Sequence, residues 1–181
     1  VSREWAQRAR NVAARADWLE ATVVGGEGEA RTAEIGWALA HGGDLQELLR
    51  RLPAVARLRA GGAEAELGPL LSAPVLDAGL LKRATGGGDE EDEETAEALR
   101  PLRHAAALYA VMKSSALTTI GWAAFAGCSS LTSVTLPAGI TSIGDYAFNG
   151  CSSLVGPKLP DGACVGAHAF DGCKACNRTA K

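Results

Sequence analysis

The chain repeats itself in three consecutive stretches, LTTIGWAAFAGCSSLTSVTLPAG (residues 117–139), ITSIGDYAFNGCSSLVGPKLPDG (residues 140–162) and ACVGAHAFDGCKAC (residues 163–176). Equivalent positions hold an aliphatic residue, a phenylalanine and a cysteine: Ile120, Ile143 and Val165; Phe125, Phe148 and Phe170; Cys128, Cys151 and Cys173. Each unit is too short to bury its own apolar side chains, so these leave water by stacking on the next unit. The repeat therefore predicts a solenoid whose function lies on an outer face.

The second unit carries the most specific motif of the chain. It reads Ile-Gly-Asp-Tyr-Ala-Phe-Asn-Gly-Cys-Ser-Ser-Leu from Ile143 to Leu154, which resembles the BspA-type leucine-rich repeats position by position. The resemblance covers about a third of the chain. It implies a right-handed stack of short strands and turns, with a strand after each motif, that binds proteins or surfaces and has no chemistry of its own.

Composition excludes several classes of function. The chain has 181 residues, which suits one domain or two small ones, and a net charge of −3. A pI near 5.7 gives no field that would recruit nucleic acid. The longest apolar runs are broken by charges or glycine before 18 residues, so we expect no membrane span.

The five cysteines do not form a disulfide scaffold. Cys128, Cys151 and Cys173 share one repeat position, and we expect their side chains to form an inward ladder of reduced thiols. Reduced thiols, and the lack of a leader-like segment after Val1, favour an intracellular compartment without fixing it.

The residues before the repeats predict helices. Apolar spacings of three and four indicate helices over Ser2–Val24 and Thr32–Ala40, a third from Asp44, and a helical segment broken by prolines over Leu67–Lys82. Ala38–Leu52 predicts a helical hairpin, with a degenerate ankyrin unit as the alternative.

An acidic run separates this region from the repeats. Gly86–Gly88 are followed by six carboxylates, Asp89–Glu94, which predict a disordered loop rather than a calcium site, because the alternating ligands of a calcium loop are absent. A helix over Thr95–Ser114 would then cover the first coil. The predicted divisions are a helical region (1–85), a Gly-rich acidic linker (86–94), a capping helix (95–116) and the repeats (117–181). The fold class is α+β, with a helical region followed by a leucine-rich-repeat solenoid of about two and a half coils.

One short motif suggests a metal. Cys173 and Cys176 have C-x-x-C spacing, and Cys164 and His168 are the nearest further ligands for zinc. The repeat offers another explanation, because Cys176 stands where Leu154 stands in the previous unit. No arrangement typical of a nucleophile, a phosphate loop or a dinucleotide site is present, so we expect neither an enzyme nor a cofactor.

The positions that differ between repeats while the core is kept are the candidates for partner binding. They are Trp122, Asp145, Tyr146, His168, Thr135 and Lys158. The competing interpretation for Trp122 is that it packs on the capping helix. The sequence thus predicts a non-catalytic protein–protein interaction module with an unidentified protein partner. The alternatives are a structural fragment of a longer repeat protein and a small zinc-binding module.

Overall fold

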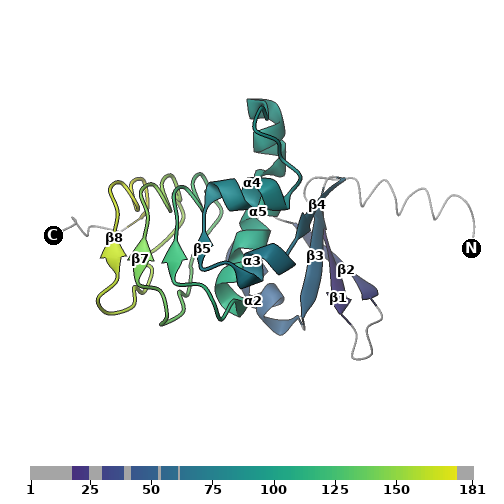
Figure 1. The fold of residues 1–181 in the computed structure, drawn as a ribbon, viewed down its shortest axis with the longest axis horizontal. Coiled ribbons are helices and arrows are strands. Elements are labelled where there is room, and N and C mark those ends of the chain that lie inside the picture. Colours follow the sequence, from purple (N-terminus) through teal and green to yellow (C-terminus); the bar gives the residue numbers. More distant parts are fainter. Residues whose placement is uncertain (1–17, 25–29, 39–41, 53, 61, 175–181) are drawn as a thin grey trace, which may run out of the picture.

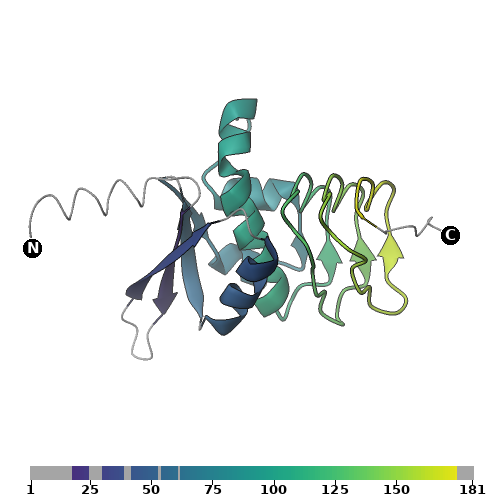
Figure 2. The ribbon, with the colours of Figure 1, turned by 180° about the vertical axis from the view of Figure 1, so that it is seen from behind.

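The computed structural model describes residues 18–24, 30–38, 42–52, 54–60 and 62–174. It shows a small antiparallel sheet, then a layer of helices, and then a stack of thin coils on the far side of those helices (Figure 1). Seen from behind, helix α5 again stands between the sheet and the coils (Figure 2). In chain order the elements are β1 (Trp18–Val24), β2 (Ala30–Ala38), α2 (Gly42–Arg51), β3 (Val55–Ala60), β4 (Ala63–Glu66), α3 (Gly68–Ser72), β5 (Val75–Leu76), α4 (Ala78–Ala84), α5 (Glu93–Lys113), β6 (Thr119–Ile120), β7 (Ser142–Ile143) and β8 (Cys164–Val165).

The antiparallel sheet has the strand order β2-β1-β3-β4. Along β3, Leu58 is buried while Arg57 and Arg59 are exposed, as expected when one face of a sheet is covered. The covered face meets α5, where the hydroxyl of Tyr109 accepts a hydrogen bond of 2.7 Å from the backbone N–H of Val55. This buried bond ties the sheet to the central helix.

Two of the predicted helices are wrong. The described part of Ser2–Val24 is strand β1, and that of Thr32–Ala40 lies in strand β2, which also removes the first arm of the predicted hairpin. β1 pairs antiparallel with β2 on one side and with β3 on the other. That pairing satisfies its backbone through segments distant in sequence, which a local spacing of three and four cannot reveal. The remaining residues of both ranges lie outside the described residues.

The helix predicted from Asp44 is confirmed as α2. The predicted helical segment over Leu67–Lys82 is divided into α3, strand β5 and α4. Pro69 lies in the first turn of α3, and Pro74 immediately precedes β5, so each proline stands where a missing N–H costs little. Strand β5, like β3 and β4 of the antiparallel sheet, was not predicted from the sequence.

The acidic run is anchored at its centre, contrary to the predicted disordered loop. The side chain of Glu91 is only 5% exposed and pairs with Arg103 at 2.7 Å and with Lys82 at 3.7 Å. Asp92 caps α5 by accepting a hydrogen bond of 2.7 Å from the backbone N–H of Thr95, which lowers the pKa of this carboxyl. Lys82 lies before the acidic run and Arg103 lies after it. Their ion pairs with Glu91 offset the repulsion between carboxylates that the sequence alone suggests.

The helix predicted over Thr95–Ser114 is confirmed as α5. From Leu102 to Val111 every residue except Arg103 is buried. A helix that is buried all round lies inside a protein rather than on its surface. α5 is therefore the central element of the molecule.

The coils form a parallel sheet with the order β5-β6-β7-β8. Its inward residues stack one per coil: Leu76, Ile120, Ile143 and Val165. The rings of Phe125 and Phe148 lie 4.9 Å apart at an angle of 4°, and those of Phe148 and Phe170 lie 5.2 Å apart at 5°. The Sγ of Cys151 donates to the carbonyl of Phe125 at 3.0 Å, and that of Cys173 to the carbonyl of Phe148 at 3.2 Å. The predicted inward ladder of free cysteines is present.

The first coil is covered by three elements rather than by α5 alone. Strand β5 pairs with β6, so it satisfies the strand edge that α5 was expected to cover. The ring of His104, on α5, meets that of Phe125 edge-on at 6.3 Å and 89°. With its side-chain amide oriented to match its neighbours, Gln46 on α2 donates to the carbonyl of Ser133 at 3.1 Å and accepts from the N–H of Thr135 at 3.2 Å. Strands expected after each repeat motif appear only as isolated bridges.

Candidate interaction surface

The turns that follow β6, β7 and β8 form one line of surface residues, exposed except for the half-buried Ala123, which we name the turn ridge. It consists of Trp122, Ala123, Asp145, Tyr146, Ala167 and His168. The N–H of Ala123 donates to the carbonyl of Asp145 at 3.2 Å, and that of Tyr146 to the carbonyl of Ala167 at 3.0 Å. These bonds hold the turns of successive coils in register.

The backbone of the turn ridge is tightly constrained. A methyl group on Gly144 would lie 2.9 Å from the carbonyl carbon of Gly121, so the coils approach too closely there for a side chain. Two residues further on, Ala123, Tyr146 and His168 have φ values of 53°, 57° and 56°. In the described part of the chain they are the residues other than glycine with a positive φ. A side chain in this conformation costs about 1–2 kcal/mol.

The turn ridge also carries exposed aromatic surface. Trp122 is 62% exposed and Tyr146 is 41% exposed. α5 therefore leaves most of the Trp122 surface open. The rings of Tyr146 and His168 stack at 5.1 Å and 21°. Three adjacent coils thus present an indole, a phenol and an imidazole along one line.

Two carboxylates on this surface are held by hydrogen bonds. Oδ1 of Asp145 accepts from the backbone N–H of Ala167 at 2.7 Å. Oδ2 of Asp171 lies 2.7 Å from Nδ1 of His168, and both side chains are more than half exposed. Each bond fixes one carboxylate oxygen and so orients the group before any ligand arrives.

The other two predicted site residues lie on a different wall of the coil. Thr135 and Lys158 face each other in an isolated parallel bridge, well after the turns of their own coils. The N–H of Thr135 is taken up by Gln46 of α2. The structure therefore separates the six predicted residues into the turn ridge, which gathers four of them, and this bridge.

The predicted zinc ligands are not assembled in the part of the chain that the structure describes. Cys173 is committed to the carbonyl of Phe148 and His168 to Asp171, while Cys164 is exposed on β8. Cys176 lies outside the described residues. Among the residues that are described, no group of three or more His, Cys, Asp or Glu side chains could hold a metal ion.

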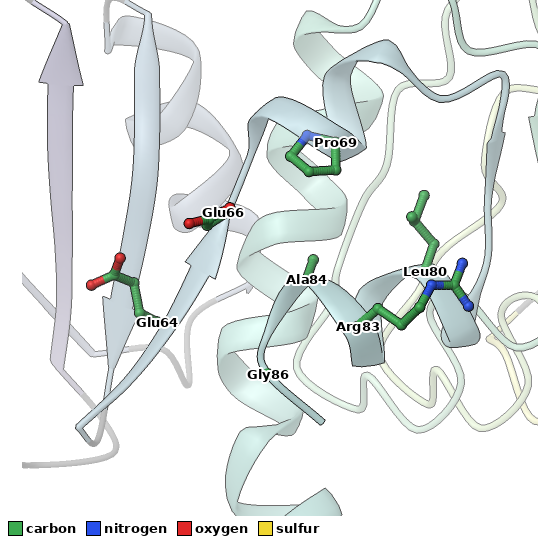
Figure 3. Close-up of a pocket in the computed structure, with 7 residues that line it drawn as sticks. All are labelled: Glu64, Glu66, Pro69, Leu80, Arg83, Ala84 and Gly86. Atoms are coloured by element: carbon green, nitrogen blue, oxygen red, sulfur yellow. The ribbon is translucent and has the colours of Figure 1, made fainter. Parts of the chain in front are cut away.

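A pocket of about 380 Å³ lies among β4, α3 and α4. Its lining residues are Glu64, Glu66, Pro69, Leu80, Arg83, Ala84 and Gly86. In Figure 3 the two carboxylates turn toward β3 while the guanidinium of Arg83 points away from them. The carboxylate of Glu64 pairs with Arg57 at 3.2 Å. These polar groups diverge, and a catalytic site needs them to converge on one point.

Comparison with known proteins agrees with the repeat. Residues 106–179 match the family described as "BspA type Leucine rich repeat region (6 copies)". Repeats of the BspA leucine-rich type are thus present within these residues. The predicted α+β class with a leucine-rich solenoid is confirmed by the order of the elements, while the predicted N-terminal helical region contains a four-stranded antiparallel sheet. Repeats of this family are generally non-catalytic. None of the described helices is long and apolar enough to cross a membrane.

Two solved structures of leucine-rich repeat proteins are similar to part of the chain. The crystal structure of a T. pallidum leucine-rich repeat protein is 40% identical over 31% of this chain and 27% of that chain, with a TM-score of 0.30. A leucine-rich repeat protein from Bacteroides ovatus ATCC 8483 is 30% identical over 32% of this chain and 21% of that chain, with a TM-score of 0.27. The chain thus spans about a quarter of the length of these proteins. A search of curated proteins found no match.

Proposed function

We propose that this chain is a non-catalytic protein–protein interaction module whose turn ridge contacts a protein partner. The observation that carries the proposal is the left-handed conformation of Ala123, Tyr146 and His168. Glycine would adopt this conformation without strain, yet all three repeats have a side chain there. Strained residues persist only where the surrounding fold holds them in place, and they cluster at functional sites.

The side chains beside this strain suit an interface. Trp and Tyr are the residues that most often dominate binding energy, because they remove a large area from water at a small cost in entropy. Trp122 and Tyr146 are both exposed, on a scaffold whose own core is closed by Phe125 and Phe148. We infer that Thr135 and Lys158 belong at most to a second, weaker contact, since Gln46 already occupies the backbone there.

The proposal is tested by affinity capture from cell extract, read by quantitative mass spectrometry. The baits are the intact chain, a Trp122→Ala/Tyr146→Ala variant, and a Thr135→Ala/Lys158→Ala variant as the matched control on the other wall. All three must first show the same thermal midpoint, so that loss of binding does not reflect loss of fold. We expect one or more proteins to be enriched by the intact chain and the control, and at least tenfold less by the first variant.

Two outcomes would count against the proposal. Equal capture by all three baits would remove the turn ridge from the interface. Loss of capture with the Thr135 and Lys158 substitutions alone would move the interface to the other wall of the coil.

A further inference from the structure

The coils carry few cations, because residues 114–173 contain one lysine, Lys158, and no arginine. The carboxylates on or beside the turn ridge are Asp145 and Asp171, both exposed. The guanidinium of Arg100 lies against Gly127 in the first coil, but it is paired with Glu97 at 2.6 Å. Carboxylates and aromatic faces therefore stand together on the turn ridge, whose residues carry no ammonium or guanidinium group, and Lys158 lies on the other wall of the coil.

We propose that the turn ridge binds a peptide segment that presents arginine side chains, with lysine as a weaker substitute; this rests on the proposed function. An arginine could stack its guanidinium on Trp122 or Tyr146 and donate hydrogen bonds to Asp145 or Asp171. Cations are attracted to the electron-rich face of an aromatic ring. Arginine combines this stacking with planar donation to a carboxylate, which the compact lysine ammonium cannot match.

The internal hydrogen bonds of Asp145 and Asp171 favour an arginine ligand. Oδ1 of Asp145 and Oδ2 of Asp171 are used internally, by Ala167 and His168. Within the described residues no hydrogen bond uses the second oxygen of either group. Each is thus oriented by one oxygen and has the other available as an acceptor. A binding group that is already oriented loses little entropy when the ligand arrives.

The length of the surface sets the length of the ligand. Adjacent coils lie about 4.8 Å apart, so the three coils of the turn ridge extend over about 10 Å. An extended peptide rises about 3.3 Å per residue, and its alternate side chains point to the same face. Arginine at every second position of a hexapeptide gives three side chains about 6.6 Å apart, which together span slightly more than the ridge.

The test uses a fluorescein-labelled hexapeptide amide of alternating arginine and serine, with binding measured by fluorescence anisotropy at low and physiological salt. The same peptide with citrulline for arginine has nearly the same shape without the charge. We expect the arginine peptide to bind at least tenfold more tightly than the citrulline peptide. Asp145→Asn/Asp171→Asn should weaken the binding of the arginine peptide at least fivefold. Asparagine keeps an oxygen that can accept from Ala167 or His168, so the turn should stay folded.

A charge-matched control separates a site from diffuse attraction. Asp89→Asn/Glu90→Gln also removes two negative charges, from exposed positions in the acidic run. It should change the affinity for the arginine peptide by less than twofold. Equal weakening by both double variants, or equal binding of the two peptides, would overturn the arginine proposal. If neither peptide binds while capture of a protein still depends on Trp122 and Tyr146, the arginine proposal fails and the proposed function stands. If capture also ignores those two residues, both fail.

Discussion

His104 is the residue at which the repeats meet the rest of the chain. It is 5% exposed on α5, and its ring lies edge-on to that of Phe125, the first ring of the phenylalanine ladder. Burial lowers the pKa of its imidazole from 6.5 to about 4. Within the described residues its Nε2 has no hydrogen-bond partner. His104 is therefore neutral when folded, and protonation must disrupt the contact.

This sets a pH dependence of stability. Between pH 6.5 and 4 the unfolded chain binds a proton at His104 and the folded chain does not, so the free energy of unfolding decreases as pH falls. A lowering of the pKa from 6.5 to about 4 corresponds to a loss of up to about 3 kcal/mol. Urea unfolding of the intact chain and of a His104→Leu variant, from pH 7 to 4, measures this. The intact chain should lose more stability than the variant, and parallel curves would contradict the assignment.

The repeat alignment predicts which residues form the core of the coils but not which residues have a strained backbone. Ile143, Phe148 and Cys151 could be placed in the interior because each recurs at a fixed spacing. The positive φ of Tyr146 could not be predicted, because a residue other than glycine gives no signal in the sequence for a left-handed backbone conformation. Glycine at one of its equivalents would have been the signal. His104 could not be predicted either, because it lies in a helix that does not repeat.

Strand β5 adds one strand to the parallel sheet ahead of the repeat strands. It pairs in parallel with β6, Val75 opposite Thr119 and Leu76 opposite Ile120, so the stack begins before α5. The N–H of Gly121 donates to the carbonyl of Leu76 at 2.6 Å, as that of Gly144 does to Ile120 one coil later. α4, the acidic run and α5 thus lie between β5 and β6, the next strand of the parallel sheet.

A pair of substitutions tests whether β5 belongs to the apolar core of the solenoid. Leu76 is fully buried, whereas its neighbour Val75 is 40% exposed on the outer face. Leu76→Ala should lower the free energy of unfolding by about 2–5 kcal/mol, because it leaves a cavity at the end of the apolar stack. Val75→Ala, in the same strand, should cost less than about 1 kcal/mol. If Leu76→Ala lowers the free energy of unfolding as little as Val75→Ala does in chemical denaturation, β5 is not part of the core.

Elements made by local repetition were predictable, and elements made by distant pairing were not. α5 and α2 were found because their caps and apolar spacings lie within their own sequences. β1 and β2 were predicted as helices because their partners are separate segments, and apolar residues in short strands can match a helical period by chance. β5 has two residues, which is too short for any periodicity. Its signal is the alignment of Leu76 with Ile120, one position before the turn.

At the scale of the whole molecule, the buried apolar side chains run without a break from Ala21 in the antiparallel sheet to Ala169 in the last coil. The predicted division into helical region, linker, capping helix and repeats stays a prediction, and this continuous core gives it a test. If α5 couples the sheet to the coils, a defect in one must destabilise the other. If the linker separates two units, it will not.

Cys151 reports on this coupling from inside the coils. It is fully buried, and contact with the thiol of Cys128, together with burial, raises its pKa, so it reacts with iodoacetamide only after the coils open. Leu58→Ala, in the antiparallel sheet, should cost about 2–5 kcal/mol and speed alkylation of Cys151 more than tenfold, measured for each cysteine by peptide mass spectrometry. Val155→Ala is a nearby control, 58% exposed in the coils, and should leave the rate almost unchanged. If Leu58→Ala melts the sheet while Cys151 reacts no faster, the repeats are an independent unit and the boundary lies before them.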